Sequence, residues 1–213
     1  MLNRPFVSDF LNMFYIAFFT MKILRKGVAY RKEIWYNISW FKIICIYRER
    51  GFLIILGIDP GYAIVGYGVL EYNGYSFKPL GYGAITTAAG ADFSLRLTDI
   101  YNDMQTVIHK FKPDVMSIEK LFFNTNQKTG IDVAQARGVI VLAAAQSGLK
   151  ICEYTPLQVK QSVVGYGRAE KKQVMEMTRT ILGLKSVPKP DDTADALALA
   201  ICHGHSSSAI RYE

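Results

Sequence analysis

Apolar residues from position 53 onward follow first the period of a strand and then that of a helix. Leu53–Ile58 is a continuous apolar run, as expected of a strand that is buried on both faces. Two more strands are predicted at Ala63–Glu71 and Tyr75–Thr87, and the Asn73-Gly74 pair between them is typical of a hairpin turn. The three segments therefore predict an antiparallel meander.

The pattern after the third strand alternates between helices and short strands. Apolar residues recur every three or four positions from about Phe93 to Lys112, which predicts an amphipathic helix. The later elements are predicted in this order: a strand at Val115–Glu119, a helix from about Gly130 to Ser147, a strand at Lys150–Tyr154, a short helix after Thr155-Pro156, and helices at Ala169–Leu182 and Asp192–His203. Three antiparallel strands followed by alternating helices and strands indicate a mixed-sheet α/β domain.

The net charge of the chain is concentrated in its first quarter. With 213 residues and 50% hydrophobic content, the chain can form one domain with a full core. Of its net charge of +7, residues 1–52 carry +6, from nine Lys or Arg and three acids, and they also hold both tryptophans. Only +1 therefore belongs to residues 53–213, and the basic composition says little about the main domain.

Residues 1–52 form an atypical basic and aromatic extension. Their longest charge-free run, Phe10–Met21, has 12 residues and is too short to span a bilayer. A signal peptide and an amphipathic membrane anchor are open alternatives for this segment. We favour the hypothesis that translation begins at Leu53 and that residues 1–52 are not part of the natural protein.

The cysteines indicate a reducing compartment. Cys45, Cys152 and Cys202 are odd in number, widely spaced and form no Cys-x-x-Cys pair, so neither a disulfide framework nor a zinc site is predicted. We expect a cytoplasmic location and no membrane partner.

Two of the predicted strands end in a carboxylate. Asp59 follows the first apolar strand and precedes Pro60-Gly61, which alone would suggest simple turn chemistry. Glu119 ends the fourth strand, where it could equally be a solvated terminus. In α/β sheets, however, active groups collect at the carboxyl ends of strands, so both residues are candidates for catalysis.

Two more acids, Asp192 and Asp195, open the last helix three residues apart, which places them on one face of its first turn. Capping is the alternative role, because Asp is favoured at helix N-termini, and Asp191 is the stronger candidate for a pure cap. Four clustered carboxylates repel one another unless cations bind among them, and hard oxygen ligands select Mg²⁺ or Mn²⁺. Two such ions could stabilise both oxygens of a phosphodiester displacement.

Residues 54–205 resemble the RuvC family of crossover (Holliday) junction endodeoxyribonucleases, within the ribonuclease-H-like superfamily. Five blocks in order carry the resemblance: ILGIDPGYAIVGYGV (55–69), SIEKLFFNTN (117–126), AQARGV (134–139), PLQVKQSVVGYGRAEKKQV (156–174) and DDTADALALAICH (191–203). The resemblance implies a ribonuclease-H-like five-stranded sheet, three strands antiparallel and two parallel, flanked by helices. It places the nuclease domain at 53–205 and leaves 206–213 as a C-terminal tail.

The resemblance also implies the chemistry. Asp59, Glu119, Asp192 and Asp195 fall on the family's four acidic positions and would hold two Mg²⁺ per active site, with Mn²⁺ as a substitute. Some relatives carry His where this chain has Asp192. The expected activity is resolution of four-way DNA junctions in recombination and repair, by metal-activated water that nicks two strands of like polarity. The products would be ligatable 5′-phosphate and 3′-hydroxyl ends.

The expected partners are junction DNA, a second copy of the chain, and a branch-migration motor complex. The resemblance assigns DNA contacts to Phe122, Lys160, Arg168 and Lys171, although lysines are more often solvated and phenylalanines more often core residues. The predicted helix near 130–147 has more apolar residues than one stripe needs, which suits a helix packed on a partner subunit or one buried within a monomer.

Two other functions are compatible with parts of the pattern. Actin-like and sugar-kinase-like nucleotide-binding proteins also begin with a strand and a GIDxG-like loop, but they need two such halves, and the chain has no GxxxxGK[ST] motif. A catalytically silent junction-binding module would keep the fold without the cutting, and the intact acidic residues argue against it.

Overall fold

The computed structural model describes residues 51–121 and 127–209, with residues 127–129 and 208–209 described by their backbone alone. Its centre is a five-stranded sheet in the order β3-β2-β1-β4-β5. The elements are β1 (Leu53–Asp59), β2 (Ile64–Tyr72), β3 (Phe77–Thr86), α3 (Phe93–Phe111), β4 (Val115–Glu119), α4 (Gln127–Gln146), β5 (Lys150–Tyr154), α5 (Pro156–Val164), α6 (Lys171–Ile181) and α7 (Asp191–Ala209). The predicted fold class is confirmed.

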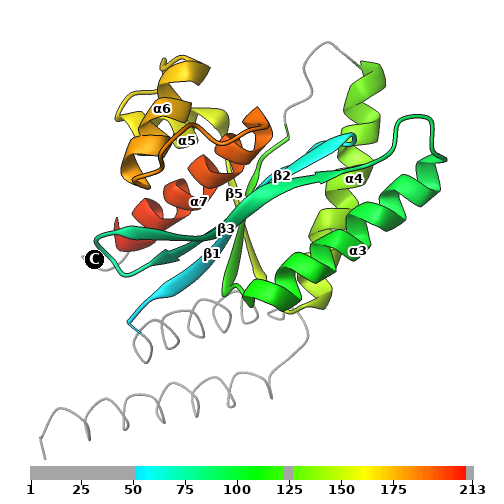
Figure 1. The fold of residues 1–213 in the computed structure, drawn as a ribbon, viewed down its shortest axis with the longest axis horizontal. Helices are drawn as coiled ribbons and strands as arrows, with labels where there is room; N and C mark the ends of the chain where they lie inside the picture. Colours follow the sequence, from blue (N-terminus) through cyan, green and yellow to red (C-terminus); the bar gives the residue numbers. More distant parts are fainter. Residues whose placement is uncertain (1–50, 122–126, 210–213) are drawn as a thin grey trace, which may run out of the picture. The chain divides into compact units, whose positions relative to one another are not determined.

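The sheet is antiparallel on one side and parallel on the other. β1 pairs with β2, and β2 with β3, in antiparallel register, whereas β1 with β4 and β4 with β5 are parallel. Figure 1 shows α3 and α4 on one side of the sheet and α5, α6 and α7 on the other. The parallel half needs the α3 and α4 crossovers, since parallel strands cannot be joined by a tight turn.

The hairpin between β2 and β3 is longer than predicted. The side-chain carbonyl of Asn73 accepts hydrogen bonds from the backbone N–H groups of Tyr75 (3.0 Å) and Ser76 (2.8 Å), so these two residues belong to the turn. The expected strand start at Tyr75 is therefore wrong by two residues. A bulge follows, because Val69 pairs with Gly81 but Leu70 pairs with Pro79.

The main hydrophobic core lies between the sheet and the α3–α4 pair. Its fully buried members include Ile58 and Ile118 from the sheet, Met104 from α3 and Ile140 from α4. On the opposite face α7 is buried almost throughout its middle, where Ala, Leu and Ile residues follow one another. No helix in the described part of the chain is long and apolar enough to cross a lipid bilayer.

Helix α7 lies directly on the backbone of β1 and β2, because three glycines leave room for it. A Cβ built on Gly57 would meet the carbonyl of Ala196, one on Gly66 would meet the carbonyl of Asp192, and one on Gly68 would lie 2.6 Å from Leu197 Cδ2. On the neighbouring strand the buried Ser117 hydroxyl donates to the Leu199 carbonyl at 2.7 Å. These contacts fix the height and position of α7 over the sheet.

Gly66→Ala should therefore lower the free energy of unfolding by about 3 kcal/mol, because the added methyl overlaps backbone that has no rotamer to change. Urea denaturation of the full chain measures this. Gly138→Ala is the matched control: Gly138 is exposed on α4 and a Cβ there meets nothing within 4 Å, so the variant should be as stable as wild type or more stable. Equal stability of the two variants would contradict close packing of α7 on β2.

Candidate active site

The two strand-end carboxylates lie side by side. β1 and β4 are parallel neighbours, and Ile58 and Ile118 are register partners at their carboxyl ends. Asp59 and Glu119 come one residue later on each strand, so their side chains leave the same face of the sheet at the same end. The register of the sheet thus joins two residues that are 60 positions apart in the sequence.

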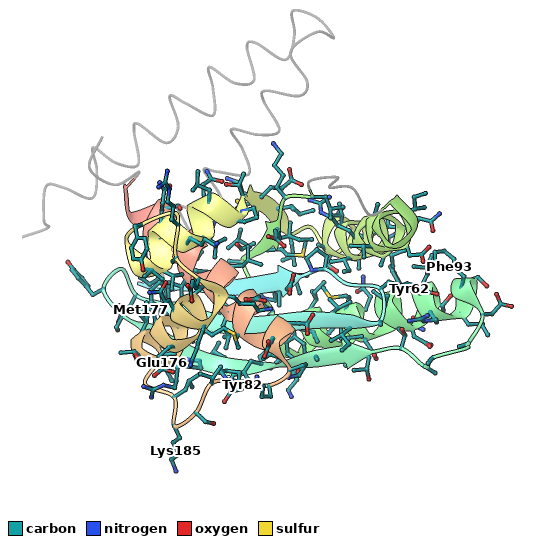
Figure 2. All side chains as sticks on the ribbon, turned by 90° about the horizontal axis from the view of Figure 1, so that it is seen from above. Tyr62, Tyr82, Phe93, Glu176, Met177 and Lys185 are labelled. Carbon is teal, nitrogen blue, oxygen red and sulfur yellow. The ribbon has the colours of Figure 1, made fainter. Side chains whose placement is uncertain are left out.

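The loop after Asp59 is held by an aromatic contact. Tyr62 stacks on Phe93 with ring centroids 5.1 Å apart, as Figure 2 shows, and the Arg96 guanidinium lies 3.6 Å from the Tyr62 ring centroid. Gly61 does not have the positive φ that a turn-forming role would require. Instead, a Cβ at Gly61 would collide with the Ile64 carbonyl, so the glycine permits a tight return into β2.

Helix α7 brings its first turn to the same place. Gly66 is the register partner of Asp59, and the Asp192 backbone lies against Gly66. Asp195, one turn further along the helix, lines a cavity that Asp59 and Glu119 also line. The close packing described above therefore places the α7 acids beside the strand-end acids.

This cavity, which we call the acidic cup, has a volume of about 260 Å³. It is lined by Asp59, Glu119, Pro156, Val159, Lys160, Lys171, Val174, Asp195 and Leu199. Three of the four predicted acidic residues and two of the predicted basic residues thus share one site. Asp192 is not among the lining residues.

Lys171, the first residue of α6, forms ion pairs with acids at the start of α7. Its Nζ lies 2.9 Å from Asp195 Oδ2 and 3.9 Å from Asp191 Oδ2. Asp191 also accepts a hydrogen bond of 2.6 Å from Lys189. Asp191 is the first residue of α7 and pairs with these lysines, which differs from the simple cap that the sequence suggested.

The environment of the acidic cup destabilises the charged form of its carboxyl groups. Burial and the nearby charges of Asp195, Glu119 and Asp192 raise the pKa of Asp59 to about 7, although Lys171 acts in the opposite direction. Burial and Asp195 also raise the pKa of Glu119. Burial raises the pKa of Asp195 as well, despite its hydrogen bond to Lys171. Such mutual repulsion is what a bound cation would relieve.

The donor set suits a hard divalent cation. All of the candidate ligands are carboxylates, which are ligands that hard cations prefer. In the structure the Lys171 ammonium, a monovalent cation, is paired with one of them, Asp195. The side chains are not drawn together into a ready coordination sphere: among the residues described, no group of three or more His, Cys, Asp or Glu has that arrangement. To hold a metal ion, the carboxylates would have to lie closer together, and Asp195 would have to release the Lys171 ammonium.

Two of the four predicted DNA-contacting residues, Lys160 and Lys171, line the acidic cup. Arg168 is exposed in the loop between α5 and α6, outside the cavity lining, and this loop begins at Gly165, whose φ of 92° a residue with a side chain rarely adopts. Phe122 lies outside the described residues.

Sequence reasoning missed the apolar wall of the cup. Pro156 and Val159 of α5, Val174 of α6 and Leu199 of α7 line it beside the carboxylates. Helical periodicity marks Val159 and Val174 as inward-facing, but it does not show what they face. The start of α5 is fixed by a capping box, in which Thr155 Oγ1 accepts from the Gln158 N–H and the Gln158 side chain accepts from the Thr155 N–H.

Comparisons with known proteins agree with this geometry. Residues 55–203 match the family model described as "Crossover junction endodeoxyribonuclease RuvC". The protein of that name from Ruminiclostridium cellulolyticum is 63% identical over 154 residues, covering 72% of this chain and 93% of the relative, and the one from Clostridioides difficile is 58% identical over 155 residues, covering 73% and 92%. Two solved structures also match, each covering 73% of this chain and 95% of the other. Thermus thermophilus RuvC has a TM-score of 0.68 at 34% identity, and the same protein in complex with a Holliday junction substrate has 0.67 at 31%.

The raised pKa of Asp59 predicts a pH-dependent stability. Asp59 titrates near 3.8 when unfolded and at about 7 when folded, so between these values only the unfolded chain releases the proton and wild-type stability falls as pH rises. Asp59→Asn lacks this titration. In chelator it should be more stable than wild type by roughly 2–4 kcal/mol at pH 8, with the difference vanishing toward pH 4.

Urea unfolding at several pH values measures this difference. Asp99→Asn, at an exposed position on α3, is the control and should follow wild type at every pH. A constant difference between Asp59→Asn and wild type across this range would show that Asp59 is not held in a repulsive environment.

Proposed function

Since this chain belongs to the RuvC family of crossover junction endodeoxyribonucleases, we propose that its acidic cup hydrolyses phosphodiester bonds in four-way DNA junctions. The observation that supports this most directly is the convergence of Asp59, Glu119 and Asp195, from β1, β4 and α7, on one cavity that also contains Lys160 and Lys171. The related Thermus thermophilus RuvC has been solved in complex with a Holliday junction substrate, which is the substrate class proposed here.

RuvC-family proteins are metal-dependent nucleases. We propose that Mg²⁺, with Mn²⁺ as a substitute, is held by Asp59, Glu119, Asp192 and Asp195, two ions to a site. Bound there, the metal would supply Lewis-acid stabilisation of the phosphate and of the attacking water. Asp192 is not among the residues that line the cavity, but its charge is close enough to raise the pKa of Asp59.

The chain's own residues account for binding and orientation. A phosphate that enters the cup meets three carboxylates, so it needs positive charge beside it, and Lys160 and Lys171 lie on the cavity wall to provide it. Once Asp195 is neutralised by another cation, the Lys171 ammonium can turn from that carboxylate to a phosphate oxygen. The apolar wall formed by Val159 and Leu199 limits water beside the reacting bond.

The bond changes follow from the proposed products. Water adds to the phosphorus, the bond from phosphorus to the 3′ oxygen breaks, and that oxygen takes up a proton. The ends are then a 5′-phosphate and a 3′-hydroxyl, which a ligase can rejoin. Two symmetric nicks in strands of like polarity require two cups, and therefore two copies of the chain, on one junction.

We propose that the homodimer forms through the outer face of α4. Ile131 (58% exposed) and Leu142 (50%) lie on this helix together with the exposed Gly138, at which a Cβ would meet nothing within 4 Å. The inner face is separately buried by Ala136 and Ile140. An apolar outer stripe with a glycine at its centre lets the same helix of a second copy approach closely.

We further propose a cytoplasmic location and a branch-migration motor complex as a partner, both by analogy with the family. Because the chain belongs to the RuvC family, we discard the alternative of an actin-like or sugar-kinase-like nucleotide-binding protein. The following experiment distinguishes a nuclease from a module that binds junctions without cutting them.

The full chain incubated with a synthetic four-way junction and Mg²⁺ should give symmetric nicks that ligase can seal, and no nicks in EDTA. Asp59→Asn should lower the cleavage rate by at least about 100-fold, because a carboxylate proposed to hold the metal ion is lost, while the dissociation constant for the junction in EDTA stays within about twofold. Asp99→Asn should cleave as wild type does. Binding without any cleavage by the wild-type chain would favour the silent module instead.

Leu142→Glu should convert the dimer to a monomer, because it places a charge within the proposed apolar contact. Light scattering coupled to gel filtration measures the mass. Tyr75→Glu is the control, since Tyr75 is 91% exposed at the β2–β3 turn and lies outside α4. A Leu142→Glu chain that elutes with the wild-type mass would place the dimer contact elsewhere.

A further inference from the structure

We propose that Arg137 of α4 is a positioning residue that sets the direction of Glu119, and that it thereby connects the proposed dimer helix to the acidic cup. The inference rests on the proposed function, because it concerns the metal site formed by that carboxylate. Arg137 does not line the cup, and nothing in the family match assigns it a role.

Arg137 contacts the catalytic strand through the main chain. Its Nε donates to the carbonyl oxygen of Glu119 at 3.3 Å. Glu119 is the last residue of β4, and the N–H of the next residue, Lys120, donates to the Tyr154 carbonyl of β5 at 2.8 Å. The peptide group between Glu119 and Lys120 therefore has both of its polar atoms held, one by the sheet and one by Arg137.

Fixing this peptide group constrains the Glu119 side chain. The direction of the Cα–Cβ bond follows from the positions of the main-chain atoms around it, and at the end of a strand few contacts hold those atoms. The bond from Arg137 to the Glu119 carbonyl holds them from the side of α4, and so keeps the carboxylate toward the cavity that it lines. Apart from burial, the charges that shift the pKa of Glu119 are those of Asp195 and Lys171. Arg137 thus acts through the carbonyl and not through the field at the carboxylate.

The guanidinium is itself held in place at its other end. Arg137 Nη2 forms an ion pair with the Glu153 carboxylate of β5, and the Arg137 side chain is 17% exposed. Two donors of one planar group therefore join α4 to the ends of two neighbouring strands, a fork geometry that lysine cannot reproduce. Because Gly138 of the proposed dimer face is the next residue, assembly of the dimer and alignment of Glu119 depend on the same turn of α4.

The test uses the full chain and Mg²⁺ alone as the probe. Arg137→Gln should weaken the Mg²⁺ affinity measured by calorimetry without DNA by about tenfold, as is typical when a residue that supports a metal ligand is lost. It should lower kcat on the junction by a similar factor, with KM and the dimer mass unchanged. Arg137→Lys should recover only part of the loss, and Glu153→Gln, which leaves the bond to Glu119, should lose less than Arg137→Gln.

A paired variant separates positioning from simple stabilisation. Arg137→Met combined with Glu153→Met replaces the ion pair by apolar contact, so its urea stability should stay within about 1 kcal/mol of wild type. We expect its Mg²⁺ affinity to remain as low as that of Arg137→Gln. Wild-type Mg²⁺ affinity in this double variant or in Arg137→Gln would overturn the inference. Absence of Mg²⁺ binding and cleavage in the wild-type chain would instead overturn the proposed function.

Discussion

The close contact of α7 with the backbone of β1 and β2 is the constraint on which the rest of the structure depends. Gly57 and Gly66 allow the backbone of the helix to lie directly on the strands, and Gly68 leaves room for the Leu197 side chain. Because Gly66 pairs with Asp59, this contact brings the first turn of α7 beside the end of β1. The same glycines that allow close packing therefore determine the distance between carboxylates that come from opposite ends of the domain.

Gathering carboxylates costs free energy, and the fold offsets that cost locally. Helices α5, α6 and α7 all begin near the acidic cup, with Pro156 and Lys171, the first residues of α5 and α6, lining it directly. The positive ends of helix dipoles favour negative charge, and the Lys171 ammonium bonds to Asp195. The remaining stress appears as the raised pKa of Asp59, which burial and its acidic neighbours cause. A site built in this way would be relieved by the cations that we propose it holds.

The sequence allowed the elements of the fold to be predicted more fully than the contacts between them. Hydrophobic patterns located the five strands and the helices in the described part of the chain, because β1 is buried on both faces and most other elements bury one. Strand ends suggested Asp59 and Glu119 as site residues. Packing between distant elements decided the rest. The Lys171–Asp195 pair, the apolar wall around Val159 and the Asn73 turn depend on side-chain geometry that no spacing encodes. The N-terminal extension and Phe122 lie outside the described residues, so those predictions stay predictions.

The bulge at Leu80, next to Pro79, affects how copies of this chain can associate. β3 is an outer strand of the sheet, and it pairs irregularly with β2 at Leu70. Proline has no N–H to donate to an added strand, and a bulge increases the local twist, so that a flat strand cannot pair along it. Pairing of this edge with a strand of a second molecule is therefore disfavoured, which leaves the other surfaces of the domain for contacts between copies.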